Sequence, residues 1–155
     1  VGLICTSVFG THGHPRARQY AIDMGIGLQI VNIMRDVKED AERGRVYFAA
    51  HDLAKHGLTA DDILAGVYDE RFIALMRQQG MRAHRHFRSG KRLLPLLDLR
   101  SRMCVNVLQG VYAEILKRIE KRNYDVLSER VSLSTPAKLA AIGKLWAGAA
   151  VIRPQ

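Results

Sequence analysis

The sequence predicts an all-α protein, and three observations lead to this prediction. Apolar residues recur every three or four positions along most of the 155 residues, which is the period of an amphipathic helix. Residues that favour the first turn of a helix, such as Pro15 and the pair Thr135 and Pro136, stand before these stretches. No stretch alternates apolar and polar residues as a half-buried strand would. We therefore expect a single bundle of helices.

The individual elements follow from the same signals. The expected helical segments, in chain order, are 1–10, 16–41, a short turn at 51–55, 59–65, 69–89, 99–121 and 135–149. Gly44 ends the second of these segments. Thr59 caps the fourth, with Asp61 and Asp62 in its first turn, where the helix dipole favours acids. Pro95 breaks the chain before the segment that begins near residue 99.

The composition is that of a soluble globular domain with excess positive charge. Hydrophobic residues make up 48% of the chain, and the formal net charge is +9. A basic protein favours anionic partners such as diphosphates, anionic lipids or nucleic acid. We expect Cys5 and Cys104 to be buried, reduced thiols of a cytoplasmic protein. The histidines fit no metal-binding spacing, and we expect them on the surface or in loops.

The most informative pattern is formed by Asn32, Asp36 and Asp40, which follow one another at intervals of four residues. Four residues advance an α-helix by about 400°, so these side chains lie on one face and rise by about 6 Å from one to the next. Carboxylate and amide oxygens suit a hard cation, and Mg²⁺ typically takes one or two protein carboxylates together with substrate phosphates.

Arginines surround these acids. Arg35, Arg43 and Arg45 carry guanidinium groups, whose planar forks match the oxygens of a phosphate. Acids and arginines together indicate metal-assisted handling of a diphosphate. The alternative is a plain solvent-facing helix on which Lys38 and Arg43 balance the acids.

Two features favour the functional interpretation of this helix. The preceding residues 24–34 (MGIGLQIVNIM) are apolar enough to be buried, so the acids continue a helix that faces the core. Gly25 and Gly27 lie within it, and each destabilises a helix by about 1 kcal/mol relative to alanine. Close packing, or room for a ligand, usually offsets such a loss.

The run Gln29-x-x-Asn32-x-x-Arg35-Asp36-x-x-Glu39-Asp40-x-x-Arg43-Gly44-Arg45-x-Tyr47 closely resembles the second aspartate-rich motif of the squalene/phytoene synthase family. The resemblance continues over almost the whole chain, from the opening VGLICTSVFG to the later VYAEILKRIEKRNYDVLSERVSLSTPAKL. Within the family, the segments NIMRD and YDVLSERVSLS look most like those of bacterial presqualene diphosphate synthases, with phytoene synthases a near second. One departure is Phe48 and Ala49, where the family usually has Leu-Pro.

The resemblance implies an isoprenoid-synthase-type helical bundle, of which residues 1–155 form only the C-terminal half of one domain. The first residue is Val1, the opening reads as the middle of a helix, and the family's first acidic motif is absent. We therefore expect a fragment of a longer protein, and we expect the isolated fragment to be inactive.

The resemblance also implies roles for particular residues. The expected metal ligands for Mg²⁺ are Asn32, Asp36 and Asp40, and the expected catalytic residues are Asp36, Asp40 and Tyr112. The expected diphosphate-binding residues are Gln29, Arg35, Arg45, Tyr47 and Arg130, with Lys138 a weaker candidate. From the residues alone, Gln29 could equally bond a neighbouring helix, Tyr112 could be a core tyrosine, and Arg130 could be a solvated arginine.

The function implied is a head-to-head prenyltransferase that condenses two allylic prenyl diphosphates, farnesyl diphosphate to presqualene diphosphate or squalene, in hopanoid- or sterol-type isoprenoid biosynthesis. NADPH enters if the reaction proceeds to squalene. Phytoene synthesis from geranylgeranyl diphosphate is the nearest alternative. Two others remain open, namely a class I terpene cyclase with the same metal-ligand spacing and a non-enzymatic basic helical binding module. We expect a cytoplasmic protein, with peripheral association at the inner face of the membrane and without a nucleic-acid partner.

Overall fold

A computed structural model describes residues 14–132, and this part of the chain contains helices and no strand, as expected. The elements are α2 (Ala17–Arg35), α3 (Val37–Glu42), α4 (Ala50–Lys55), α5 (Ala60–Leu64), α6 (Glu70–Gly90), the 3-10 helix η1 (Lys91–Leu96) and α7 (Leu99–Lys121). The helices expected at 1–10 and 135–149, together with Cys5, His12 and Lys138, lie outside the described residues.

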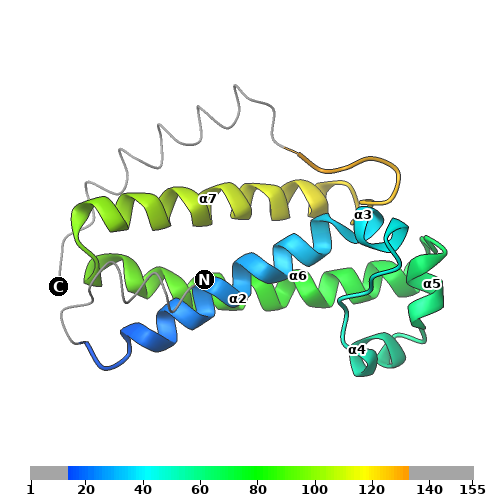
Figure 1. Cartoon of the computed structure of the whole chain (residues 1–155), viewed down its shortest axis with the longest axis horizontal. Helices are drawn as coiled ribbons and strands as arrows, with labels where there is room; N and C mark the ends of the chain where they lie inside the picture. The colour runs from blue at the N-terminus through cyan, green and yellow to red at the C-terminus, as the bar shows by residue number, and fades with distance from the viewer. Residues whose placement is uncertain (1–13, 133–155) are drawn as a thin grey trace.

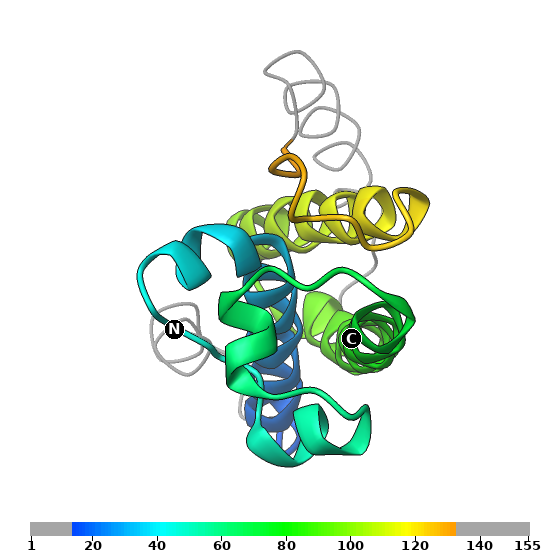
Figure 2. The ribbon, with the colours of Figure 1, turned by 90° about the vertical axis from the view of Figure 1, so that its right-hand side faces the viewer.

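Three long helices form the body of the molecule (Figure 1). Helices α6 and α7 run in opposite directions and are joined by η1, while α2 crosses them obliquely. The short helices α3, α4 and α5 gather at the end of the bundle opposite η1. Figure 2 looks along the bundle from that end and shows α2, α6 and α7 packed around a common centre.

Helices α2 and α6 approach each other closely because each contributes a glycine to the contact. A Cβ atom added to Gly27 of α2 would lie 2.7 Å from the ring of Phe87. A Cβ atom added to Gly90 of α6 would lie 2.9 Å from Cα of Met24. Both distances are too short for real contacts, so only glycine allows this spacing. Close packing therefore offsets the low helix propensity of Gly27.

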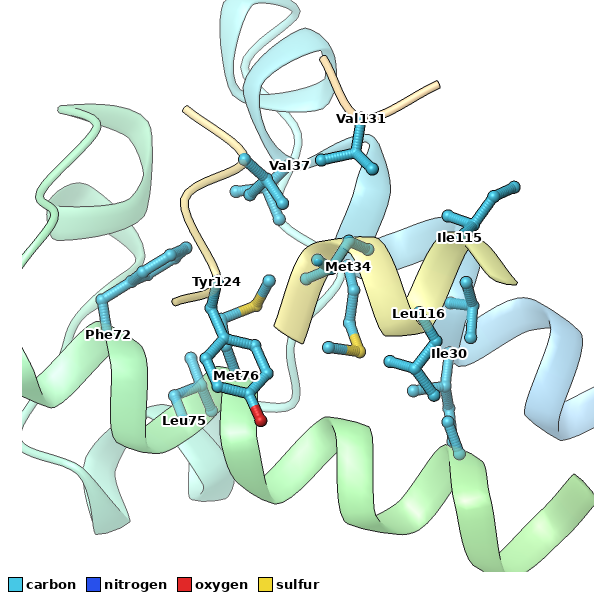
Figure 3. Close-up of a cluster of buried hydrophobic side chains, with 14 of the residues drawn as sticks. Ile30, Met34, Val37, Phe72, Leu75, Met76, Ile115, Leu116, Tyr124 and Val131 are labelled. Atoms are coloured by element: carbon cyan, nitrogen blue, oxygen red, sulfur yellow. The ribbon is translucent and has the colours of Figure 1, made fainter. Parts of the chain in front are cut away.

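One continuous apolar core joins these helices to the short ones (Figure 3). Met34 from α2, Met76 from α6 and Leu116 from α7 are fully buried at its centre. Burial of this kind stabilises a protein by roughly 1.5–3 kcal/mol per large apolar side chain. The core also includes Val131, which follows α7, and it thereby fixes the path of the chain beyond that helix.

The helix ends largely follow the expected signals. Thr59 and Asp62 form a reciprocal capping box at the start of α5, as Thr59 predicted. Asp69 and Asp98 cap α6 and α7 through their carboxylates. Gly44, which follows α3, has a φ of +69°, the left-handed conformation that favours glycine.

The expectation of one unbroken helix over 16–41 is wrong, because α2 ends at Arg35 and α3 begins at Val37. Between them, Asp36 has φ −99° and ψ 15°, which lie outside the helical region. Neighbouring residues of a regular helix point about 100° apart and do not face each other. Asp36 nevertheless forms a two-pronged contact with Arg35, which a regular helix would not permit.

Two smaller expectations also need correction. Cys104 is an exposed free thiol and not a buried one, because it lies on the outer side of α7. His86 is a half-buried helical residue rather than a surface or loop residue. Its Nδ1 lies 3.1 Å from Oδ1 of Asp23, and the hydroxyl of Ser89 donates to Oδ2 of Asp23 over 2.5 Å. Asp23 thus joins α2 to α6.

Candidate functional site

The carboxylate of Asp36 lies between two arginines. Nε of Arg35 donates to Oδ1 of Asp36 over 2.8 Å, and Nη2 of Arg35 donates to Oδ2 over 2.5 Å. Nη2 of Arg130, which lies 94 residues further along the chain, donates to the same Oδ1 over 2.9 Å. The break between α2 and α3 places Asp36 where arginines from two distant segments can reach it.

These arginines hold the pKa of Asp36 below its usual range. Partial burial raises this pKa, because it disfavours the charged form, but the hydrogen bonds and positive charges of Arg35 and Arg130 lower it further than burial raises it. The contact with Asp36 likewise raises the pKa of Arg35. Asp36 is therefore ionised at neutral pH, which is the form that binds a metal ion.

Tyr112 of α7 connects this carboxylate to the interior of the bundle. The guanidinium carbon of Arg35 lies 6.0 Å from the centre of the Tyr112 ring, within the range of a cation–π contact. Arg35 therefore contacts Asp36 and Tyr112 at once, and it links α2 to α7. The structure thus brings together four of the residues singled out from the sequence: Arg35, Asp36, Tyr112 and Arg130.

A sharp turn after α7 brings Arg130 back toward this cluster. Asn123 and Tyr124 have φ values of 51° and 65°, the left-handed region that few residues other than glycine adopt. The hydroxyl of Tyr68 donates to the carbonyl of Asn123 over 3.0 Å, and Tyr124 is buried in the core. These contacts offset the strain of the two residues and reverse the chain direction after Lys121.

Contacts of the two residues that follow Arg130 hold its segment over α3. Val131 is 2% exposed, and Figure 3 shows it beside Val37 of α3. Nη1 of Arg118 donates to the carbonyl of Ser132 over 3.0 Å. The position of Arg130 next to Asp36 is therefore a consequence of the fold and not of the ion pair alone.

A mainly apolar cavity of 260 Å³ lies between α2 and α7. Its apolar lining consists of Ala21, Met24, Gly25, Leu28, Leu93, Val105 and Leu108, and its polar lining consists of Gln29, Asn32 and Tyr112. Facing surfaces of these two helices therefore line most of the cavity. Gly25 lines this space, while Gly27 packs against α6, so the two glycines of α2 serve different purposes.

Asn32 has an unsatisfied polar atom at the site. Its Oδ1 is buried and accepts no hydrogen bond within the described residues. Buried polar atoms of proteins nearly always have a partner, so each exception calls for an explanation. An oxygen of this kind beside an ionised carboxylate suits a cation or the hydrogen-bonded water that a cation carries.

Asp40 lies one turn beyond Asp36, to whose carbonyl its N–H donates over 2.9 Å, and it shares a recess with Arg45 and Tyr47. Val37 and Ile63 also line this small recess, which shares no lining residue with the cavity. In the described part of the chain, neither Arg45 nor Tyr47 hydrogen-bonds to Asp36 or ion-pairs with it. The structure therefore supports Arg35 and Arg130 as neighbours of Asp36, but it does not bring Arg45 and Tyr47 to the same place.

The residues present fit a magnesium ion in the type of their donor atoms. Asn32, Asp36 and Asp40 offer oxygen ligands, and the unpartnered Oδ1 of Asn32 is the observation that favours a ligand there. Across residues 14–132, no three acidic, histidine or cysteine side chains form a group that could hold a metal ion. Magnesium needs only one or two protein carboxylates when phosphates and water supply the other ligands.

Glu39 belongs to the cluster, although no role was expected for it. Its Oε1 lies 3.0 Å from Nε of Arg130, so Arg130 bridges the carboxylates of Glu39 and Asp36. Its Oε2 is buried and has no hydrogen-bond partner within the described residues. Glu39 stands within the acidic motif, but the pairing with Arg130 joins segments far apart in sequence, and residue spacing alone does not reveal such a contact.

Comparisons with known proteins agree with this geometry. A 15-cis-phytoene synthase of Synechocystis is 34% identical over 98% of this chain, and one of Synechococcus elongatus is 38% identical over 83% of it. This chain covers 48% and 42% of those two proteins. It therefore spans about half the length of the curated relatives that it matches.

Solved structures share the helical arrangement. The squalene synthase HpnC of Alicyclobacillus acidocaldarius matches with a TM-score of 0.74 and 26% identity, over 79% of this chain and 46% of that protein. A dehydrosqualene synthase solved with a ligand matches with a TM-score of 0.77 over 95% of this chain and 56% of that protein, and at 20% identity it bears on the fold alone. The family model for squalene/phytoene synthases matches residues 1–137, and the chain belongs to the squalene/phytoene synthase family.

Proposed function

We propose that the product of the complete reading frame encoding this chain joins two allylic prenyl diphosphates head to head. The observation that carries the proposal is the apolar cavity between α2 and α7, whose polar lining of Gln29, Asn32 and Tyr112 adjoins the arginines around Asp36. An apolar cavity suits a prenyl tail, and guanidinium groups suit a diphosphate. The cavity for the prenyl tail and the arginines for the diphosphate therefore lie next to each other.

Asn32, Asp36 and Asp40 are the residues that would hold magnesium. Bound there, the metal would neutralise charge on a leaving diphosphate. Arg35 and Arg130 would bind phosphate oxygens, because guanidinium forks form paired, charge-assisted hydrogen bonds with them. Tyr112 would orient the diphosphate end of the substrate at the mouth of the cavity.

The proposed reaction class is that of the family to which the chain belongs, and the arrangement is compatible with it. The C–O bond of the donor breaks, and the diphosphate leaves with the electron pair, so that an allylic cation remains. The double bond of the second prenyl diphosphate supplies the electrons for a new C–C bond, and loss of a proton closes a cyclopropane ring that keeps one diphosphate. The apolar walls contributed by Leu28, Val105 and Leu108 would exclude water from the cation.

Two prenyl chain lengths are candidates, and a specific observation favours each. The motif wording around NIMRD and the likeness to the squalene synthase HpnC support farnesyl diphosphate, with presqualene diphosphate as product and squalene if NADPH reduces it. The relatives named phytoene synthase, which are up to 38% identical, support geranylgeranyl diphosphate and a carotenoid precursor.

Substitution of the two acids tests the proposal. We expect Asp36→Asn and Asp40→Asn to lower magnesium-dependent turnover of prenyl diphosphates by roughly two orders of magnitude or more. Each substitution removes a carboxylate charge that would hold the magnesium ion, and this ion would neutralise the leaving diphosphate. Glu42→Gln is the matched control, since Glu42 is exposed on the same helix and contacts neither arginine. Unchanged turnover in both aspartate variants would contradict the proposal.

We also propose that the protein associates peripherally with an anionic membrane surface. The supporting feature is a basic stripe along one side of α6 and η1, formed by the exposed residues Arg77, Arg85, Arg88 and Arg92, with the exposed apolar Met81 among them. Their spacings of three and four residues place them on one face. No described helix is long and apolar enough to cross a bilayer. A substrate with a long apolar tail resides in membranes, so adsorption there would bring the enzyme to it.

A further inference from the structure

Arg130 contacts two carboxylates, and the two contacts differ. Its Nη2 donates to Asp36 over 2.9 Å, and its Nε lies 3.0 Å from Oε1 of Glu39. Asp36 also has both of its oxygens bonded by Arg35, whereas within the described residues Glu39 has Arg130 as its sole ion-pair partner. Asp36 can therefore lose Arg130 and remain paired, but Glu39 cannot.

A cation at Asp36 would compete with these arginines. Both oxygens of the carboxylate accept hydrogen bonds from guanidinium groups, and the positive charge of these groups repels a divalent ion, so binding of the ion favours withdrawal of one group. Arg35 is the neighbouring residue and also contacts the Tyr112 ring, whereas the Arg130 side chain is 56% exposed and reaches Asp36 from another segment. Arg130 is thus the arginine that can withdraw with less disturbance.

We propose that Glu39 is a positioning residue, which retains Arg130 at the site when Arg130 leaves Asp36 and turns its Nη groups to a diphosphate. The inference rests on the proposed function, because it assumes a metal-bound diphosphate beside Asp36. A guanidinium has five N–H donors, and a bond from Nε to Glu39 leaves the four on the Nη atoms for the ligand. The buried segment around Val131 keeps the Arg130 backbone in place throughout.

Glu39 is partly shielded, which makes it suited to this role. Its side chain is 28% exposed, half the value for Arg130, and its Oε2 is buried without a hydrogen-bond partner in the described part of the chain. A carboxylate in such surroundings interacts more strongly with a cation than one in water does. The Glu39–Arg130 contact is therefore the one expected to persist.

Calorimetric binding of inorganic diphosphate, with magnesium present, tests the proposal on the product of the complete reading frame. We expect Glu39→Ala to weaken diphosphate binding about tenfold, the usual effect of losing one charge-assisted hydrogen bond. Glu39→Leu, which fills the same space without accepting a hydrogen bond, carries the same expectation if the alanine variant does not fold. Glu42→Ala on the same helix should bind as the unsubstituted protein does.

The deciding comparison places the Glu39 substitution in an Arg130→Ala background. If Glu39 acts through Arg130, the substitution has no further effect there, and the KM for prenyl diphosphates rises more than kcat falls in the single variant. An equal loss in both backgrounds, or no loss in either, would overturn the proposal. Absence of any prenyl product from the unsubstituted protein would count against the proposed function, while the calorimetric coupling would still report on Glu39.

Discussion

At the scale of single residues, Asp36 shows how two arginines keep a partly buried carboxylate ionised. Two guanidinium groups supply positive charge at hydrogen-bonding distance, and they keep its pKa low despite partial burial. Asp40, four residues later, lies instead with Arg45 and Tyr47 in a separate recess. The two acids of the motif therefore have different surroundings, although their sequence spacing suggests equivalence.

Asp23 gives the first prediction at this scale. Its pKa is lowered, because burial raises it less than the bonds from Ser89, His86 and Gln19 lower it. A carboxylate with a lowered pKa in the folded state stabilises the protein above its unfolded pKa of about 3.9, and that contribution is lost as the pH falls. We expect Asp23→Asn to reduce the free energy of unfolding by about 1–2 kcal/mol at neutral pH.

Urea unfolding as a function of pH checks this prediction. The difference between the Asp23→Asn variant and the unsubstituted protein should shrink as the pH falls below about 4, where the unfolded carboxyl becomes protonated. Glu42→Gln, at an exposed position, serves as the control for loss of one acid. A difference that stays constant from pH 7 to the acid limit would mean that the charge of Asp23 does not stabilise the fold.

The sequence predicts the members of the site better than their contacts. The spacing of Gln29, Asn32 and Asp36 predicts that they share one face of a helix. In the structure, Gln29 and Asn32 line the cavity, and Asp36 belongs to the arginine cluster beside it. The pairing of Arg130 with Glu39 and Asp36 depends on the turn after α7, which uses left-handed Asn123 and Tyr124 without a glycine. Asn123 is a local signal for a left-handed residue at the end of α7, but it does not reveal which carboxylates Arg130 reaches.

At the scale of elements, the caps explain why most helix limits can be predicted. Thr59, Asp69 and Asp98 bond backbone N–H groups at the starts of α5, α6 and α7, and such bonds are local in sequence. The break at Asp36 is different, because it accompanies a contact between Arg35 and Asp36 that a regular helix would not form. The helical spacing of apolar residues continues across Asp36, so it predicts one helix where the structure has two.

Two glycines, Gly27 where α2 meets α6 and Gly80 where α6 faces α7, give a prediction with opposite signs. An added Cβ at Gly27 would lie 2.7 Å from the Phe87 ring, so we expect Gly27→Ala to destabilise the protein by about 1–3 kcal/mol. An added Cβ at Gly80 would lie 3.5 Å from Glu120 and 3.7 Å from Leu116, which are ordinary contacts. Gly80→Ala should therefore stabilise α6 by up to about 1 kcal/mol through helix propensity.

Chemical unfolding of the two variants under one condition measures this difference. The two substitutions are chemically identical and both occur within buried faces of long helices, so each is the control of the other. Equal effects of the same sign would show that close approach of α2 and α6 does not depend on Gly27.

At the scale of the whole molecule, the basic stripe on α6 and η1 predicts electrostatic adsorption to anionic bilayers. Within the described residues, Arg85, Arg88 and Arg92 form no ion pair, so their charges are available. Each arginine near an anionic membrane contributes about 1 kcal/mol. Replacing these three with glutamine should weaken binding to vesicles that contain anionic lipid by roughly a hundredfold.

Vesicle co-sedimentation at low and high salt measures this effect. Replacement of Arg100, Lys117 and Lys121, three exposed cations of α7, by glutamine is the matched control and should change binding much less. Salt should weaken adsorption, because it screens exposed charges. Equal losses of vesicle binding in the two triple variants would show that binding depends on net charge alone. Preferential binding to RNA over vesicles would indicate a nucleic acid as the partner in place of a membrane.

The all-α architecture and the apolar faces of α2 and α7 could be predicted, because helical periodicity reports which side of a helix is buried. The oblique crossing of α2 over α6 could not be predicted from periodicity, since it depends on the reciprocal contacts of Gly27 with Phe87 and of Gly90 with Met24. That crossing leaves the space between α2 and α7 that forms the cavity.

Product analysis tests most directly whether the complete protein joins two prenyl diphosphates head to head. The product of the complete reading frame is incubated with farnesyl or geranylgeranyl diphosphate and magnesium, with and without NADPH, and the products are identified by mass spectrometry. We predict a magnesium-dependent coupled product of thirty or forty carbons that disappears in Asp36→Asn. A cyclised product of one substrate molecule, or no magnesium-dependent product, would contradict this prediction.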